Sequence, residues 1–177
     1  MKFNFIQKIK DPMTQTSFSN IMGDVFLILS GIDYANPVRS FAALLGLSTH
    51  LFFGLRGQTT SVFGIPTPKF VMSIVIICGL LNILSGSNLM GFEVGPRYTE
   101  VTSGFFISLG AFCVVIHRSK TARWLFMGAT FSSLLIGGET FLRDGFADWF
   151  IIASALCFLV SNYVTGHIDY KKYDQDL

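Results

Sequence analysis

Charged residues are scarce in this sequence: Lys, Arg, Asp and Glu make up 14% of its 177 residues, against about a quarter in a typical soluble domain. A soluble protein of this length needs a charged surface around one core, and so few charges cannot cover that surface. The apolar residues, 51% of the chain, come in long blocks rather than in short alternating runs. Both features predict that lipid is the solvent of this chain.

Cysteine and histidine are also rare, with three of each. Cys78, Cys113 and Cys157 lie inside apolar segments without the spacing of a metal site or a disulfide, so we interpret them as small buried hydrophobic residues. Haem binding would need two histidines that face each other within the hydrocarbon, and only His50 lies deep in an apolar segment. We therefore expect no cofactor and no metal site.

Motifs of the common enzyme classes are missing as well. The sequence contains no GxSxG, no HExxH, no Walker loop and no GxGxxG that opens a helix, so we expect that the protein is not an enzyme. The basic residues form small groups between apolar blocks rather than a stripe, which excludes nucleic acid as a partner.

What the sequence does contain is a series of apolar segments that approach the length of a membrane span. A hydrocarbon core of about 30 Å needs roughly 20 helical residues to cross it. Only helices fit, because the segments lack the alternating pattern of barrel strands. We predict an all-α fold, a polytopic membrane helix bundle with about six transmembrane helices arranged as three hairpins. The six segments cover residues 18–32, 39–55, 70–90, 99–116, 122–136 and 148–166.

The segments are expected to form one transmembrane domain, residues 18–167. A basic N-terminal segment, residues 1–17, precedes this domain, and a short tail, residues 168–177, follows it. The first helix of each hairpin ends on a similar triplet, which either a threefold duplication or the frequency of Ser and Gly at helix ends would explain. The triplets are Leu29-Ser30-Gly31, Leu84-Ser85-Gly86 and Ile136-Gly137-Gly138.

The basic residues are distributed unevenly between the two ends of these segments. With the N-terminus in the cytoplasm, ten of the 13 Lys and Arg residues fall on that side, as the positive-inside rule requires. We therefore predict that both termini are cytoplasmic, in a bacterial inner (plasma) membrane or in an organelle membrane that obeys the same rule. The loops on the opposite side are assigned Arg39, Arg97 and Arg143.

Six acidic residues accompany these three arginines on the same side. These acids either form a mouth that concentrates cations, or they are simply the charges left on this side when the basic residues are kept on the other side. The six are Asp33, Glu93, Glu100, Glu139, Asp144 and Asp148.

Asp24 lies within the first apolar segment, where an ionised carboxylate costs roughly 2.5–3.5 kcal/mol on insertion scales. Such residues usually face the bundle interior, and the nearest candidate partner is His50 in the second segment. Their depths below the intervening turn differ by less than about one helical turn, so they are expected to face each other. Because histidine titrates near neutral pH, the pair is predicted to carry a proton or bind a cation. The alternative is that Asp24 lies nearer the headgroups and that His50 only makes a structural hydrogen bond.

The second segment supports this pairing with a stripe of small residues. Ala42, Gly46 and Gly54 recur with His50 at every fourth position, and such a stripe lets another membrane helix approach closely. We interpret the three small residues as a helix-packing face. Asn82 in the third segment is the next polar candidate, and its amide is predicted either to ligate a substrate or to join two helices.

Three hypotheses about function follow. The first is a transporter or channel for a proton, a cation or a small solute, with Asp24, His50 and Asn82 on the substrate or ion path. The second is a non-catalytic accessory or assembly subunit, and the third is a membrane-embedded enzyme that acts on lipid. The expected partners are the lipid bilayer together with other membrane subunits or further copies of the chain.

Outward-facing small residues would be the mark of an accessory subunit, because a partner helix could pack closely against them. Two pairs of small residues fit such faces: Gly104 with Ser108, and Gly128 with Ser132.

Overall fold

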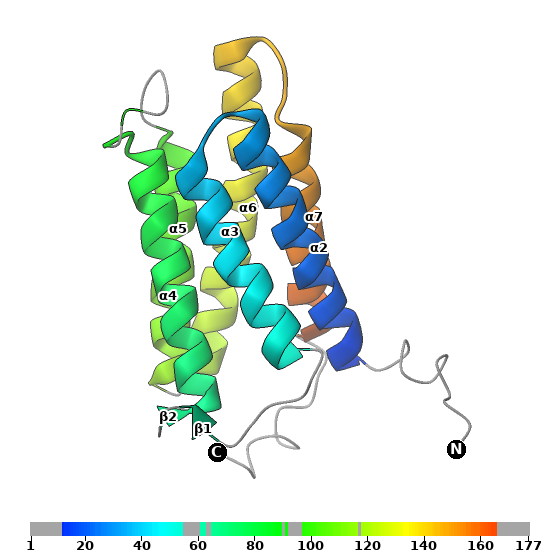
Figure 1. The fold of residues 1–177 in the computed structure, drawn as a ribbon, viewed down its shortest axis with the longest axis vertical. Helices are drawn as coiled ribbons and strands as arrows, with labels where there is room; N and C mark the ends of the chain where they lie inside the picture. Colours follow the sequence, from blue (N-terminus) through cyan, green and yellow to red (C-terminus); the bar gives the residue numbers. More distant parts are fainter. Residues whose placement is uncertain are drawn as a thin grey trace, which may run out of the picture.

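In the computed structural model, the described part of the chain forms a closed ring of six helices (Figure 1). The structure describes residues 12–54, 61–62, 65–89, 91, 97–116 and 118–165. Each helix packs against the helices before and after it, and the last helix packs against the first, which closes the ring. The helices are α2 (Pro12–Asp33), α3 (Pro37–Thr49), α4 (Thr67–Gly86), α5 (Tyr98–Val115), α6 (Ser119–Asp144) and α7 (Trp149–Thr165).

Two short elements lie between α3 and α4. A π-helical segment, η1 (His50–Gly54), continues α3, and two strands of two residues each, β1 (Ser61–Val62) and β2 (Ile65–Pro66), pair antiparallel before α4. The prediction of an all-helical fold is confirmed, because these strands are the only β-structure in the part of the chain that the structure describes.

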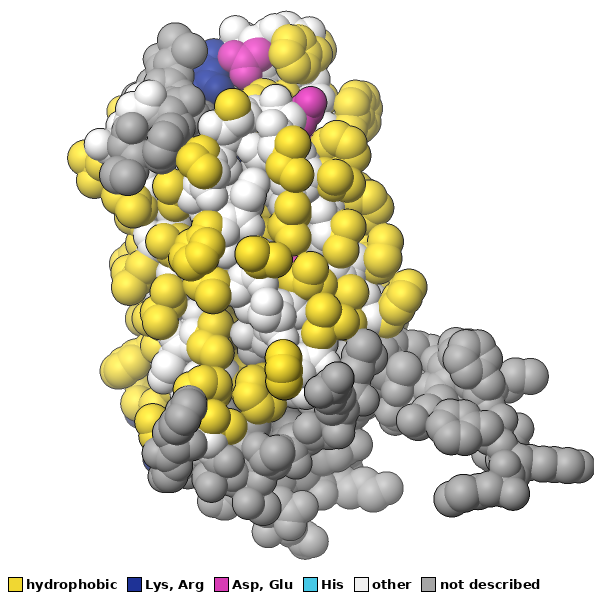
Figure 2. All heavy atoms as spheres, in the orientation of Figure 1, with side chains coloured by type: hydrophobic (Ala, Val, Ile, Leu, Met, Phe, Trp, Pro, Cys, Tyr) yellow, Lys and Arg dark blue, Asp and Glu magenta, His cyan; other side chains and the backbone are white. Residues whose placement is uncertain are grey.

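Three of the helices are long and apolar enough to cross a membrane: Lys69–Gly86 in α4, Tyr98–Val115 in α5 and Lys120–Asp144 in α6. The apolar part of α7, Trp149–Val164, is shorter. Hydrophobic side chains cover most of the visible face of the ring, and charged side chains gather at one end of it (Figure 2). Length and composition therefore qualify three helices, not six, as membrane spans.

The three helical hairpins α2–α3, α4–α5 and α6–α7 all turn at the same end of the ring, which we call the hairpin end (Figure 1). In the first two hairpins the residue before the second helix donates its backbone N–H to a glycine carbonyl on the first. Asn36 bonds Gly31 and Arg97 bonds Gly86, each at 2.7 Å. The same backbone hydrogen bond thus joins the two helices in both hairpins.

A glycine at the corresponding place brings the two helices of each hairpin together. A Cβ on Gly31 or on Gly86 would stand 2.8 Å from a backbone nitrogen of the second helix, and one on Gly137 would stand 2.5 Å from the Ile152 side chain. The third hairpin therefore aligns through Gly137 rather than Gly138, one residue earlier than the triplets suggest. This shared geometry supports a threefold repeat.

Several predicted boundaries were wrong. Helix α2 begins at Pro12, so residues 12–17 belong to the helix rather than to an N-terminal segment. Helix α6 runs to Asp144 instead of ending near residue 136, and its last turns protrude from the ring in Figure 1. Gly137 lies inside this helix, where it lets Ile152 of α7 pack closely against it. The helix ends at Gly145, whose φ of +81° is the left-handed conformation that glycine adopts freely. Residues 1–11 and the predicted tail 168–177 lie outside the described residues.

Candidate functional site

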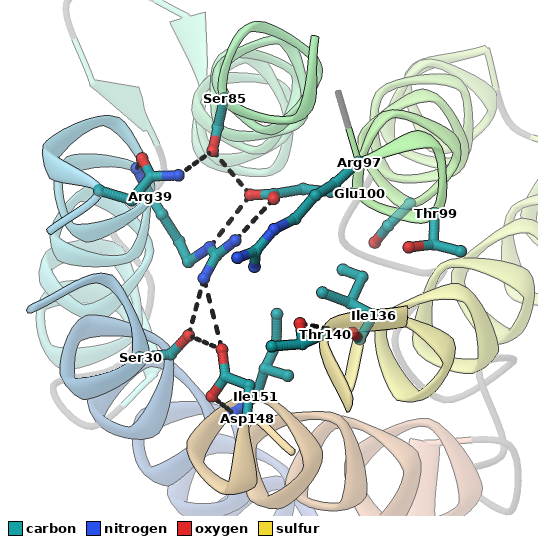
Figure 3. Close-up of polar contacts among 12 residues, drawn as sticks. Ser30, Arg39, Ser85, Arg97, Thr99, Glu100, Ile136, Thr140, Asp148 and Ile151 are labelled. Atoms are coloured by element: carbon teal, nitrogen blue, oxygen red, sulfur yellow. Dashed lines mark hydrogen bonds and ion pairs between the residues drawn. The ribbon is translucent and has the colours of Figure 1, made fainter. Parts of the chain in front are cut away.

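A network of buried charges joins the three hairpins at the hairpin end (Figure 3). Arg39, in the first turn of α3, is fully buried. Its Nε donates to Glu100 Oε1 at 3.1 Å and its Nη2 to Glu100 Oε2 at 2.6 Å, a bidentate pair with α5. Its Nη1 lies 3.4 Å from Asp148 Oδ2, immediately before α7. One arginine thus contacts carboxylates on the other two hairpins.

Hydroxyl and amide groups make further hydrogen bonds to these charged side chains. Ser30 Oγ on α2 accepts from Arg39 Nη1 at 2.9 Å and donates to Asp148 Oδ2 at 2.6 Å. Ser85 Oγ on α4 donates to Glu100 Oε1 at 2.7 Å and accepts from the amide of Asn36 at 2.7 Å. We call these residues the hairpin-end cluster: Ser30, Asn36, Arg39, Ser85, Glu100 and Asp148.

The two carboxylates of the cluster lie at helix N-termini. Glu100 is in the first turn of α5, and Asp148 Oδ1 accepts the backbone N–H of Ile151 at 3.0 Å at the start of α7. Both positions favour negative charge, because the N-terminal end of a helix dipole is positive. The helix starts therefore place favourable partial positive charge beside these two buried carboxylates.

The residues that meet here occupy corresponding positions in the three hairpins. These positions are the third residue of each second helix and the residue directly before the close-packing glycine of each first helix, and all are buried. The former set is Arg39, Glu100 and Ile151; the latter is Ser30, Ser85 and Ile136. The third hairpin contributes apolar residues at both places, and it supplies its charge from the helix cap Asp148 instead.

A second arginine lies beside the cluster. Arg97 is almost fully buried, its guanidinium carbon lies 5.0 Å from the centroid of the Tyr34 ring, and its Nη2 lies 4.0 Å from Asp144 Oδ2. Figure 3 shows its side chain directed toward the same interior as Arg39. Burial and the nearby Asp148 carboxylate raise the pKa of Tyr34, which keeps this phenol protonated near neutral pH.

Of the two interpretations of the six acidic residues, a mouth that concentrates cations does not fit two of them. Arg39, Arg97, Glu100 and Asp148 are buried within the bundle, so these two acids do not line a mouth that concentrates cations. Counting charges loop by loop could not separate buried arginines from exposed ones. The available indication was position: Arg39 follows Pro37 by two residues, inside the first turn of a helix.

The structure brings Asp24 and His50 together. His50 Nδ1 lies 2.6 Å from Asp24 Oδ2, near the middle of α2, and Asp24 is only 4% exposed. Gly46 packs directly on this carboxylate, since a Cβ there would stand 2.7 Å from Asp24 Oδ1. The His50 side chain keeps 26% of its surface exposed, so the imidazole, and not the carboxylate, is the accessible member of the pair.

The geometry of α3 changes at this histidine. The backbone N–H of His50 is shared between the carbonyls of Gly46 and Leu47, and the π-helical segment η1 begins there. Single π turns occur frequently at functional sites. Such a departure from regular helix is consistent with a positioned side chain at His50.

The predicted helix-packing face is divided between two neighbours. Gly46 faces Asp24 on α2, whereas Ala42 is buried and its carbonyl lies 3.4 Å from Cys78 Sγ on α4. Gly54 ends the π-helical segment, so the regular four-residue spacing does not continue to it.

Asn82 is buried on α4, three residues before Ser85 and four after Cys78. Within the described part of the chain, no hydrogen bond joins Asn82 to Asp24 or to His50. Asn82 instead lies between the level of Ala42 and the hairpin-end cluster. Cys78, Asn82 and Ser85 share one face of α4, over about 10 Å of helix rise. This face leads from the level of Ala42 to the hairpin-end cluster.

The two small-residue pairs that would mark an accessory subunit if they faced outward are packed against neighbouring helices instead. A Cβ on Gly104 would stand 2.5 Å from the Gly79 carbonyl oxygen, and one on Gly128 would stand 3.2 Å from the Phe106 ring. Ser108 donates to the Ile76 carbonyl, and Ser132 is buried. These faces hold the ring together and are not left for a partner.

Cavities and metal sites give no further candidates among the described residues. Two hollows of about 350 and 190 Å³ have mostly apolar linings, and Asp24, His50 and Asn82 line neither. In the same residues no group of three or more His, Cys, Asp or Glu side chains is placed to hold a metal ion. Cys78, Cys113 and Cys157 are free thiols.

The class that the fold and the site define is an all-helical ring of three similar hairpins with buried ionisable groups at two levels. The chain matches no protein-family model, no curated protein and no solved structure.

Proposed function

We propose that all six helices cross a lipid bilayer, with both termini in the cytoplasm of a bacterium and the hairpin end on the outer side. Helix α2 has 22 residues, α7 has 17, and α3 with η1 adds 13 and 5, which are lengths near those of membrane spans. Burial of Arg39 and Arg97 removes two of three basic residues from the outer loops. This strengthens the charge bias behind the orientation.

Thiol labelling tests this arrangement in a variant whose native cysteines are replaced. Ala35→Cys, in the turn between α2 and α3, is expected to react with a membrane-impermeant reagent added outside. Lys120→Cys, in the first turn of α6, is expected to react only after the membrane is made permeable. Reaction of both thiols from the same side would refute the proposed orientation.

We propose further that the protein moves protons across this membrane. The observation that carries the proposal is the Asp24–His50 pair: a carboxylate and an imidazole 2.6 Å apart, midway along a membrane helix and buried by Gly46. An ionisable pair at that depth is costly, and it is typical of proton relays. The polar face of α4 begins at the level of Ala42, about one helical turn nearer the hairpin end than Gly46, and leads to the hairpin-end cluster. A series of single polar side chains suits a proton better than a larger cation or solute.

Proton flux in liposomes that contain the purified protein tests this function. Asp24→Asn keeps the size of the side chain but removes its titration, and we expect it to lower the flux roughly 100-fold. Asp33→Asn is the matched control, because Asp33 is exposed at the end of the same helix and should leave flux within about twofold of wild type. Equal flux in wild type and Asp24→Asn would contradict the proposal.

The second candidate function is an accessory or assembly subunit of a larger membrane complex. One observation favours it: the contact of Gly46 with Asp24 seals the carboxylate in a helix interface, as a purely structural pair would be. The internal use of Gly104 and Gly128 speaks against it. Absence of proton flux from well-folded protein, with a membrane partner that co-purifies in mild detergent, would support this alternative.

A further inference from the structure

We propose that Glu100 is a second proton-binding site on the same path, and that Arg39 holds this site closed to the outer side until a proton binds. The inference rests on the proposed proton transport. It assigns a function to the hairpin-end cluster, which the Asp24–His50 pair does not explain.

The cluster lies at the end of the polar face of α4. Ser85, three residues after Asn82, donates its hydroxyl hydrogen directly to Glu100 Oε1 at 2.7 Å. Glu100 is therefore the carboxylate that the polar face of α4 contacts at the hairpin end. A proton that leaves the Asp24–His50 pair breaks an N–H bond of His50 or an O–H bond of Asp24 and forms an O–H bond on the Glu100 carboxylate. That O–H bond breaks when the proton passes to water outside and forms an O–H bond there.

The charges around Glu100 come from every neighbouring hairpin. Arg39 approaches from α3 and Arg97 precedes α5 itself, while Asp148 lies before α7. From α6, Glu139 accepts hydrogen bonds from Thr99, next to Glu100 in sequence, and Asp144 lies 4.0 Å from Arg97. Two arginines balance the two buried carboxylates, so a proton on Glu100 leaves one positive charge in excess.

Arg39 has an alternative partner already in place. It binds Glu100 at 2.6 and 3.1 Å but lies 3.4 Å from Asp148, with the Ser30 hydroxyl bonded to both Arg39 and Asp148. A buried arginine needs a carboxylate partner, and a protonated Glu100 no longer supplies one. Arg39 then moves toward Asp148, which releases the contact between the first and second hairpins while the third keeps the charge paired.

The test uses Glu100→Gln, because glutamine resembles a protonated glutamate and cannot release a proton. We expect this variant to lower proton flux roughly 100-fold. The matched control is Glu139→Gln, which changes a carboxylate at the same end that contacts Thr99 rather than Arg39. We expect the control to keep flux within about twofold of wild type.

A second measurement reports on opening without depending on flux. In a background without native cysteines, Asn82→Cys carries a thiol below the cluster, which a membrane-impermeant reagent outside should label slowly. Adding Glu100→Gln is expected to speed labelling by about tenfold, since Arg39 loses its bidentate partner. Adding Glu139→Gln should leave the rate unchanged. If Glu100→Gln fails to fold, the paired variant Arg39→Gln/Glu100→Gln removes both charges and should give the same fast labelling.

The two proposals fail in different ways. Wild-type flux in Glu100→Gln, or lost flux with unchanged labelling of Asn82→Cys, would overturn the assignment of Glu100 and leave the Asp24 result standing. A wild-type protein without proton flux would overturn the proposed function instead, whatever the labelling rate.

Discussion

Replacing Arg39 by methionine is expected to lower the free energy of unfolding by about 3–5 kcal/mol, the range found when one partner of a buried ion pair is removed. The substitution leaves two carboxylates, Glu100 and Asp148, buried without their shared cation. Reversible unfolding in mixed detergent and dodecyl sulfate micelles, followed by circular dichroism, measures the change. The control is Arg143→Met, since Arg143 is exposed and its ion pair with the neighbouring Asp144 lies at the surface, and it should cost under about 1 kcal/mol.

A double-mutant cycle separates the ion pair from simple loss of packing. Arg39→Met combined with Glu100→Met removes the bidentate pair together, and it should recover a substantial part of the stability lost in Arg39→Met alone. A loss below about 1 kcal/mol for the single variant would mean that the two carboxylates are already hydrated in the folded wild-type protein. That result would contradict the buried ion pairs described above.

Gly104→Ala is expected to lower the free energy of unfolding by about 1–3 kcal/mol or more, through overpacking between α4 and α5. The new Cβ would stand 2.5 Å from the Gly79 carbonyl oxygen and 2.8 Å from the Ile83 backbone nitrogen. Both neighbours are backbone atoms of a helix, so neither can rotate away as a side chain would. The two helices must move apart, and their close contact is lost along its length.

The matched control is Gly138→Ala on α6. Nothing lies within 4 Å of a Cβ at Gly138, and the residue is helical, so alanine should raise stability by about 0.5–1 kcal/mol. Opposite signs for the two glycine substitutions are the expected outcome of the same micelle unfolding assay. Equal effects would show that α4 and α5 do not pack as tightly as these distances require.

The helical fold and one buried contact could be predicted because they depend on local patterns. Apolar blocks of suitable length predict helices, and counting residues from a shared turn places Asp24 opposite His50. The spacing of Ala42 and Gly46 correctly indicates close packing. These inferences need only the rise of a helix and the direction of a hairpin.

The hairpin-end cluster could not be predicted in the same way, because it joins residues separated by 61 and 109 positions. Nothing in the sequence near Arg39 indicates that two later helices begin beside it. The end of α6 was missed for a related reason. Gly137 was interpreted as a helix stop, but its meaning depends on Ile152, which belongs to a different helix.

The position of Arg39 in the first hairpin has a consequence for biosynthesis. A ribosome adds about 5–20 residues per second, so a nascent chain carries Arg39 for roughly 5–20 s before Asp148 is made, 109 residues later. Glu100 follows after 61 residues, so the guanidinium first has neither carboxylate and then only one of them. In the proposed membrane arrangement, the position of Arg39 two residues after the turn lets its long side chain extend toward the lipid headgroups during this time. Under that proposal the first hairpin reaches its final state only when α7 docks against α2 and Asp148 joins the cluster.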